Sequence, residues 1–202
     1  SYQPGAMLFG TFMKEKMPLN YYLAIANGSN RAVTNDDNSQ KNLVGRLEFS
    51  PVKAIRIGAN AQNIYVKDTS GVSYGVDLSV QQKIGTKSKL IVEGEYIQGV
   101  NSTSFIADTN GLLIEDFNMT GYFAQALLKV DINKSWCKTL EFGGKFENTD
   151  PNTSKDENDY TTITGNIGFT FLPENTARLQ LNVINTNWAS AISPGGITSA
   201  NM

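Results

Sequence analysis

The sequence predicts an all-β fold, an antiparallel up-and-down sheet of about ten strands of the kind that forms a transmembrane β-barrel. Three observations predict it. Apolar and polar residues alternate with the period of two that is typical of strands. These stretches are roughly ten to fourteen residues long, whereas globular strands average about five or six and a bilayer crossing needs about nine to eleven. The links between them alternate short and long, which is the layout of an outer-membrane barrel.

The clearest strand is expected at Tyr160–Phe171, where Ile163, Ile167 and Phe169 share one face and hydroxyl and amide side chains share the other. The preceding and following stretches repeat this pattern, with less regular alternation near the N-terminus. The expected strands are, in order, Gly5–Met13, Pro18–Gly28, Asn42–Ser50, Ala54–Tyr65, Val72–Lys83, Lys89–Gly99, Thr120–Asp131, Lys138–Asn148, Tyr160–Phe171 and Thr176–Asn187. We treat residues 1–202 as a single domain.

The links predict which end of the sheet each segment occupies. The short links are Lys14–Pro18, Ser50–Lys53, Gly85–Ser88, Asn133–Lys138 and Leu172–Asn175. The longer, polar links are Gly28–Lys41, Lys67–Gly71, Asn101–Asn118 and Asn148–Tyr160. Within the third, Gly111–Phe117 is expected to form a turn of helix or to fold inward. Aromatic residues near strand ends, such as Tyr74, Tyr96 and Trp136, predict girdles at the two membrane interfaces.

Composition excludes several classes of function. The chain has no histidine, which removes Ser-His-Asp catalysis and histidine-based zinc sites. The net charge of −2 argues against a nucleic-acid partner, which favours a basic surface. The single cysteine, Cys137, cannot form an internal disulfide and is interpreted as an incidental thiol. We therefore expect neither enzymatic activity nor a cofactor or metal site.

The N-terminal residues lack the features of a secretory leader, since Ser1–Pro4 has neither a basic nor an apolar region. No apolar run approaches the 18 or so residues of a transmembrane helix. An exported protein needs a leader, so we expect either that it has been removed or that the sequence begins within a longer chain. The second is favoured, because open channels have about sixteen or more strands.

The polar faces of the strands would line the lumen of such a barrel. The candidate basic residues are Arg46, Arg56, Lys129, Lys145 and Arg178. The candidate acidic residues are Glu48, Glu93, Glu95, Glu141 and Glu147, with Asp77 on the same face. Charges on a pore wall set its ion selectivity. Alternatively, they hydrate a wide channel or pair across strands, and their mixed sign favours this second interpretation.

Two further patterns have a functional and a plainer interpretation. Glu93 and Glu95 share one strand face and could act as an acid–base pair, but wall lining is favoured because no cleft signal accompanies them. The acidic segments Asn35–Asn38 and Asp156–Asp159 could hold calcium through oxygen ligands. Neither has the spacing of a calcium-binding loop, so solvated external loops are favoured.

Several short stretches, in order along the chain, carry a family resemblance. They are LVGRLEFSP at Leu43–Pro51, VEGEYIQG at Val92–Gly99, GYFAQA at Gly121–Ala126, the segment Asp159–Phe171, and NTARLQLN at Asn175–Asn182. This order resembles the later part of the phosphate-selective porin O and P family. The resemblance implies a barrel of about sixteen strands, usually trimeric, in the Gram-negative outer membrane. It also implies passive diffusion of anions past basic residues, although no dense basic ladder is visible here.

The sequence thus predicts an outer-membrane porin fragment that lets small polar or anionic solutes, phosphate among them, cross the membrane. Its partners would be membrane lipid and these solutes. A soluble or surface-attached all-β ligand-binding protein is the main alternative. A closed ten-stranded barrel enzyme is a third interpretation, disfavoured by the missing histidine. The two main hypotheses differ in whether the face carrying Phe142, Ile167 and Leu181 points to lipid or to a core.

Overall fold

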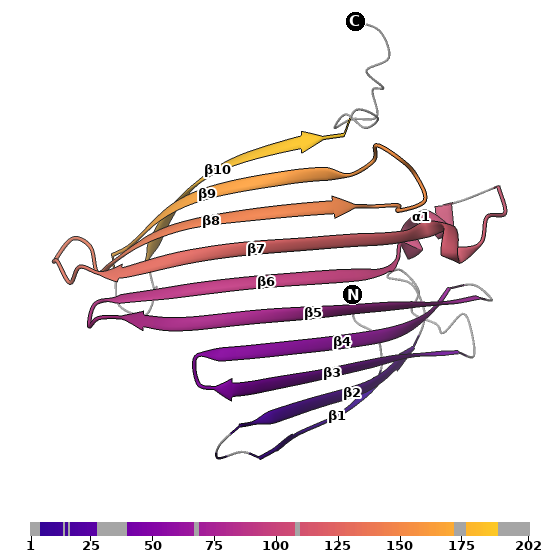
Figure 1. The fold of residues 1–202 in the computed structure, drawn as a ribbon, viewed down its shortest axis with the longest axis horizontal. Coiled ribbons are helices and arrows are strands. Elements are labelled where there is room, and N and C mark those ends of the chain that lie inside the picture. The colour runs from indigo at the N-terminus through magenta and orange to yellow at the C-terminus, as the bar shows by residue number, and fades with distance from the viewer. Residues whose placement is uncertain are drawn as a thin grey trace, which may run out of the picture.

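The fold is a single antiparallel sheet of ten strands, each hydrogen-bonded to its neighbours in the sequence (Figure 1). A computed structural model describes residues 5–13, 15, 17–27, 40–66, 69–107, 110–171 and 177–189. The strands are β1 Gly5–Phe12, β2 Leu19–Asn27, β3 Lys41–Val52, β4 Ile55–Val66, β5 Thr69–Ile84, β6 Ser88–Val100, β7 Asn118–Asp131, β8 Thr139–Asp150, β9 Tyr160–Thr170 and β10 Arg178–Trp188. All ten predicted strands are confirmed, because each overlaps one of these.

One predicted long link is wrong. Lys67–Gly71 was expected to be a loop, but β5 already begins at Thr69, so only two residues separate it from β4. Ser70 and Gly71 extend the ladder by pairing with Tyr65 and Ile64. Backbone pairing between two adjacent strands can continue through polar residues. The polar composition of this segment therefore did not reveal that it belongs to the strand.

The remaining links leave a turn end and a loop end. The turn end carries the links β1–β2, β3–β4, β5–β6, β7–β8 and β9–β10, and the loop end carries the other four (Figure 1). The expected helical turn lies between β6 and β7, as the 3₁₀ helix η1 over Ile114–Phe117. A short helix, α1 over Ser102–Ala107, was not predicted. Among the described residues, no helix has the length and apolar character to cross a membrane.

The sheet has one apolar and one polar face, which we call the outer and inner faces. Outer-face side chains are exposed, as shown by Val76 at 53%, Ile163 at 51% and Leu181 at 60%. The exposed apolar residues of this face include Leu23, Leu47, Ile57, Val76, Leu78, Val92, Phe142, Phe146, Ile163, Ile167, Leu179, Leu181 and Val183. On the inner face Ser79 is only 5% exposed and Glu141 only 1%.

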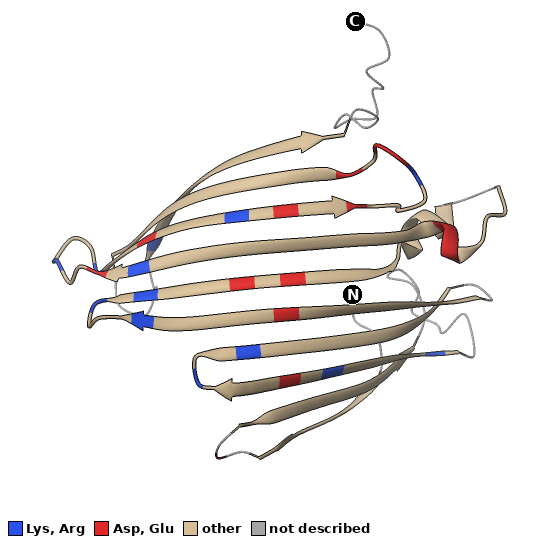
Figure 2. Cartoon of the chain, in the orientation of Figure 1, with Lys and Arg blue, Asp and Glu red and all other residues tan. Residues whose placement is uncertain are grey.

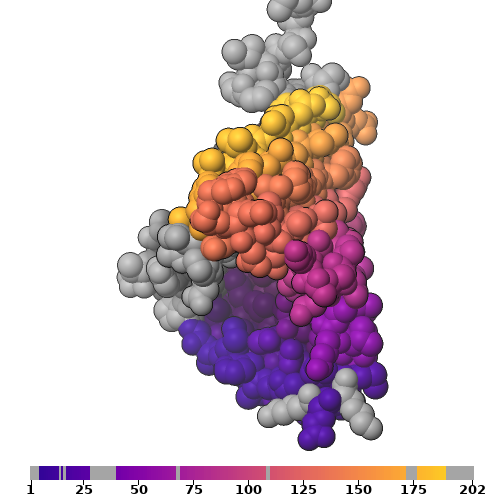
Figure 3. Space-filling model, turned by 90° about the vertical axis from the view of Figure 1, so that its left-hand side faces the viewer, coloured from indigo at the N-terminus to yellow at the C-terminus, as the bar shows by residue number. Residues whose placement is uncertain are grey.

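This difference in burial follows from the curvature of the sheet. Seen from the turn end, the sheet bends around a hollow that lies between its indigo and its orange strands (Figure 3). Side chains converge on the concave side of a curved sheet and spread apart on the convex side, so the crowded polar face is the concave one. Within the described residues β1 and β10 pair only with β2 and β9, so the sheet is open rather than closed into a barrel.

The described residues form one layer, apart from a small apolar cluster at the loop end. Ile114 and Phe117 of η1 are almost fully buried, and Phe117 meets Phe105 of α1 edge-on at 5.7 Å. The backbone N–H of Asn101 donates to the Phe117 carbonyl, and the Asn101 side chain donates to the Pro151 carbonyl. These bonds order the long β6–β7 link against the strand ends.

Candidate functional site

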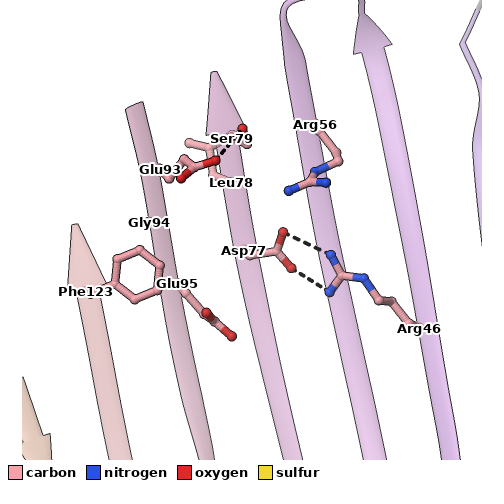
Figure 4. Close-up of a pocket in the computed structure, with 9 residues that line it drawn as sticks. All are labelled: Arg46, Arg56, Asp77, Leu78, Ser79, Glu93, Gly94, Glu95 and Phe123. Atoms are coloured by element: carbon pink, nitrogen blue, oxygen red, sulfur yellow. Dashed lines mark hydrogen bonds and ion pairs between the residues drawn. The ribbon is translucent and has the colours of Figure 1, made fainter. Parts of the chain in front are cut away.

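The candidate site is the middle of the inner face, where strands β3–β7 line a hollow of about 270 Å³. The inner-face side chains that line it are those of Arg46, Arg56, Asp77, Ser79, Glu93, Glu95 and Phe123 (Figure 4). Gly94 and Leu78, whose side chain is on the outer face, lie between these residues along β6 and β5 and complete the lining. Alternation along each strand places the charged residues on one face, and the antiparallel register brings them into shared rows. One row runs through Glu48, Gly58, Asp77, Glu95 and Phe123 on successive strands.

Arg46 is the centre of the first ion-pair cluster. Its guanidinium binds both carboxylate oxygens of Asp77, at 2.7 and 3.1 Å, as the dashed lines in Figure 4 show. It also donates to Glu48 at 3.0 Å, and Tyr22 Oη donates to the other Glu48 oxygen. Arg46 is thus held by two carboxylates in the bidentate geometry that makes such pairs strong. Its positive charge is cancelled locally.

Arg56 and the two inner-face glutamates of β6 are bound less completely. Arg56 lies 3.9 Å from Glu48 and its side chain is 49% exposed. Glu93 accepts hydrogen bonds from the Ser79 hydroxyl and the Gln125 amide, which are neutral donors that orient the carboxylate without cancelling its charge. Glu95 also lines the hollow and has no ion-pair partner among the described residues.

Glu141 is the centre of the second cluster, nearer the turn end. Lys129 on β7 lies 2.8 Å from one of its oxygens, and Arg178 on β10 binds the other. Two cations, whose side chains are about one-third exposed, therefore enclose one carboxylate that is 1% exposed. A buried carboxylate is tolerated only when it is paired and hydrogen-bonded, and Glu141 meets that requirement.

A glycine makes each cluster possible by leaving a gap in the row between the partners. Gly58 on β4 lies between Glu48 and Asp77, and a Cβ built on it would be 2.5 Å from the Arg46 guanidinium. In the second cluster Gly168 on β9 has the same place, since its Cβ would be 3.0 Å from Glu141 Oε2. The absence of a side chain lets each arginine lie flat across a strand and reach a carboxylate beyond it.

Lys145 and Glu147 form a third, local pair. Their charged atoms are 2.7 Å apart, and the Lys145 ammonium lies 4.5 Å above the centre of the Phe123 ring. The pair and the cation–π contact hold this lysine against the wall. Phe123 itself interrupts the polar pattern of the inner face of β7.

The structure places all ten predicted lining residues on the inner face. It brings Arg46, Arg56 and Glu48 together, and separately Lys129, Glu141 and Arg178. Sequence reasoning missed the glycine gaps and the donors Ser79 and Gln125. Their roles depend on the register between strands, which no spacing within one strand reveals.

The two acidic segments and Cys137, the other candidate sites of the sequence, form no cluster of metal-binding side chains among the described residues. Asn35–Asn38 lies outside the described residues, and among those described no group of three or more acidic, cysteine or histidine side chains could hold a metal ion. Asn158, within the other acidic segment, is buried and donates to the Asn152 carbonyl. Cys137 is buried, and its thiol donates to the Thr139 carbonyl at 3.4 Å.

Comparisons with known proteins give no further guide. No family model, curated protein or solved structure matches this chain. The function is therefore argued from the geometry of the two faces.

Proposed function

We propose that this chain forms part of the wall of an outer-membrane porin, a passive diffusion channel for small polar solutes. The observation that carries the proposal is the opposition of the two faces. A single-layer sheet exposes its apolar side chains on the convex face and gathers paired charges on the concave face. That is the arrangement of a lipid-facing barrel with a hydrated lumen.

The dimensions of the strands support a membrane location. Strands β3–β10 are 11 to 16 residues long, at or above the nine to eleven or so that a tilted strand needs to cross a bilayer. Toward the loop end, the outer face carries an aromatic row in which Tyr96 pairs with Tyr122, and Tyr122 lies 6.0 Å from Phe146. Aromatic rows of this kind mark the boundary between lipid and water.

The alternative, a soluble all-β binding protein, fits the described residues less well. A soluble sheet buries its apolar face beneath a second sheet or helices. In the described part of the chain, α1 and η1 lie at the loop end and leave the outer face uncovered. The open edges β1 and β10 fit a larger barrel, in which further strands would pair with both.

The resemblance implies that the solutes are anions, with phosphate among them. The pairing on the inner face does not favour that preference, because Arg46, Lys129, Lys145 and Arg178 each contact a carboxylate. Anion transport requires cations that remain available to the solute. The proposal therefore describes the permeating solutes as small and polar and includes no preference for anions.

A swelling assay with lipid vesicles tests the channel directly. Vesicles that contain the purified complete porin, with this chain as part of its wall, should swell in solutions of small uncharged sugars, at rates that fall as the sugar becomes larger. Neutral solutes report the pore itself, independently of its charge. A chain that stays monodisperse in buffer without detergent, and causes no swelling, would contradict the proposal and support the soluble alternative.

A further inference from the structure

The charges on the middle of the inner face do not balance once the ion pairs are taken into account. Arg46 is neutralised by Asp77 and Glu48, and the one ion pair of Arg56 among the described residues is its 3.9 Å contact with Glu48. Two arginines therefore stand with four carboxylates on β3–β6, since Glu93 and Glu95 line the same hollow. The neighbouring pair of Lys145 and Glu147 adds no net charge.

The glycine gap at Gly58 lets Arg46 pair with two carboxylates, so Arg46 does not offset the charges of Glu93 and Glu95. Because no side chain fills position 58, the Arg46 guanidinium lies in the row between Glu48 and Asp77, at the wall of the hollow (Figure 4). An arginine that is paired with two carboxylates contributes little to the field that a passing ion meets. Glu93 is held by neutral donors, so its charge still reaches the hollow.

Charge is also sorted along the strands. In Figure 2 acidic residues occupy the middle of β5 and β6, whereas basic residues lie at their turn ends. These are Lys83 and Lys89, directly opposite each other in the register, with Lys129 next in the row. At the rim of a pore such charges face bulk electrolyte and are strongly screened. Charges midway along the wall act more strongly on an ion, because the low-dielectric walls focus their electric field there.

From this arrangement we propose that Glu93 and Glu95 determine the charge preference of the pore, and that it favours small cations, including solutes with an ammonium or guanidinium group, over anions. The inference rests on the proposed channel function. It assigns the two glutamates an electrostatic role along the path and does not require that any ion bind tightly there, since a pore must release what it admits.

The test is the reversal potential of single channels of the complete porin, with this chain as part of its wall, in a planar lipid bilayer with a potassium chloride gradient. Glu93→Gln and Glu95→Gln should each lower the ratio of potassium to chloride permeability by about threefold at 0.1 M salt, because a carboxylate several ångströms from the ion acts through water and is partly screened. The effect should shrink at 1 M salt. The matched control is Glu115→Gln, the same chemical change at an exposed residue of η1 at the loop end.

Measuring only conducting channels excludes misfolded protein from the result. A ratio that stays unchanged in both variants, or that changes equally in the Glu115→Gln control, would overturn the inference while the conductance itself upholds the channel. Correctly folded protein that never conducts would contradict the proposed function, and the inference would fail with it.

Discussion

The inner and outer faces of the sheet use the same alternation of residues for opposite purposes. On the outer face apolar side chains point outward, contact few neighbours and remain exposed, so lipid would have to satisfy them. On the inner face charged side chains are held by partners two strands away, across glycine gaps. The comparison shows that the charged side chains of the inner face find their partners within the sheet, whereas the apolar side chains of the outer face remain exposed in the described residues.

The largest effect should come from placing a charge on the outer face. Val183→Arg should destabilise the protein in lipid by about 2 kcal/mol or more, because position 183 lies further into the apolar band than the aromatic row and its arginine must leave water. The control is the adjacent Asn182→Arg on the inner face of the same strand, which should cost less than about 1 kcal/mol. Urea unfolding from lipid vesicles measures both. Equal losses would contradict the assignment of the faces.

A smaller effect is expected from breaking the second cluster. Glu141→Gln should destabilise the protein by about 1–3 kcal/mol, since Lys129 and Arg178 lose their shared charged acceptor. The Lys129 and Arg178 side chains are about one-third exposed and can rehydrate, which limits the cost. The same unfolding assay measures it. A neutral result would mean that the inner face is held by its backbone ladder and not by these pairs.

The smallest effect should come from filling a glycine gap. Gly58→Ala should cost about 1 kcal/mol or less, because the new methyl group displaces the end of the Arg46 side chain from Asp77. Gly121→Ala is the matched control. Position 121 also faces inward, but its Cβ would meet Ile97 at an ordinary 3.5 Å, so no loss is expected. If both variants behaved alike, the gap at Gly58 would have no special role.

The features of the fold that depend on the residues of a single strand were predictable from the sequence. Period-two alternation gave all ten strands, and Tyr160–Phe171 differs from β9 by a single residue. The Lys67–Gly71 loop was wrong because polar residues there continue a ladder that only the neighbouring strand defines. Helix α1 was missed because it is short and carries no acidic residue in its first turn and no basic one in its last.

The candidate site shows the same limit. The alternation placed Arg46, Glu93 and Glu141 on the polar face, but their partners Asp77, Gln125 and Arg178 lie on other strands. Recognising that Arg46 reaches Asp77 as well as Glu48, or that Gly58 leaves a gap between them, requires the register of three strands. Only the structure supplies that register.

The most direct test of the central claim is to label the two faces in lipid at adjacent positions of β10. Leu181→Cys and Asn182→Cys would be made separately in a Cys137→Ala background, because Leu181 lies on the outer face and Asn182 on the inner face. A lipid-soluble thiol reagent should modify position 181, and a membrane-impermeant, water-soluble one should modify position 182. Protection of position 182 from the water-soluble reagent, with position 181 open to it, would contradict the account.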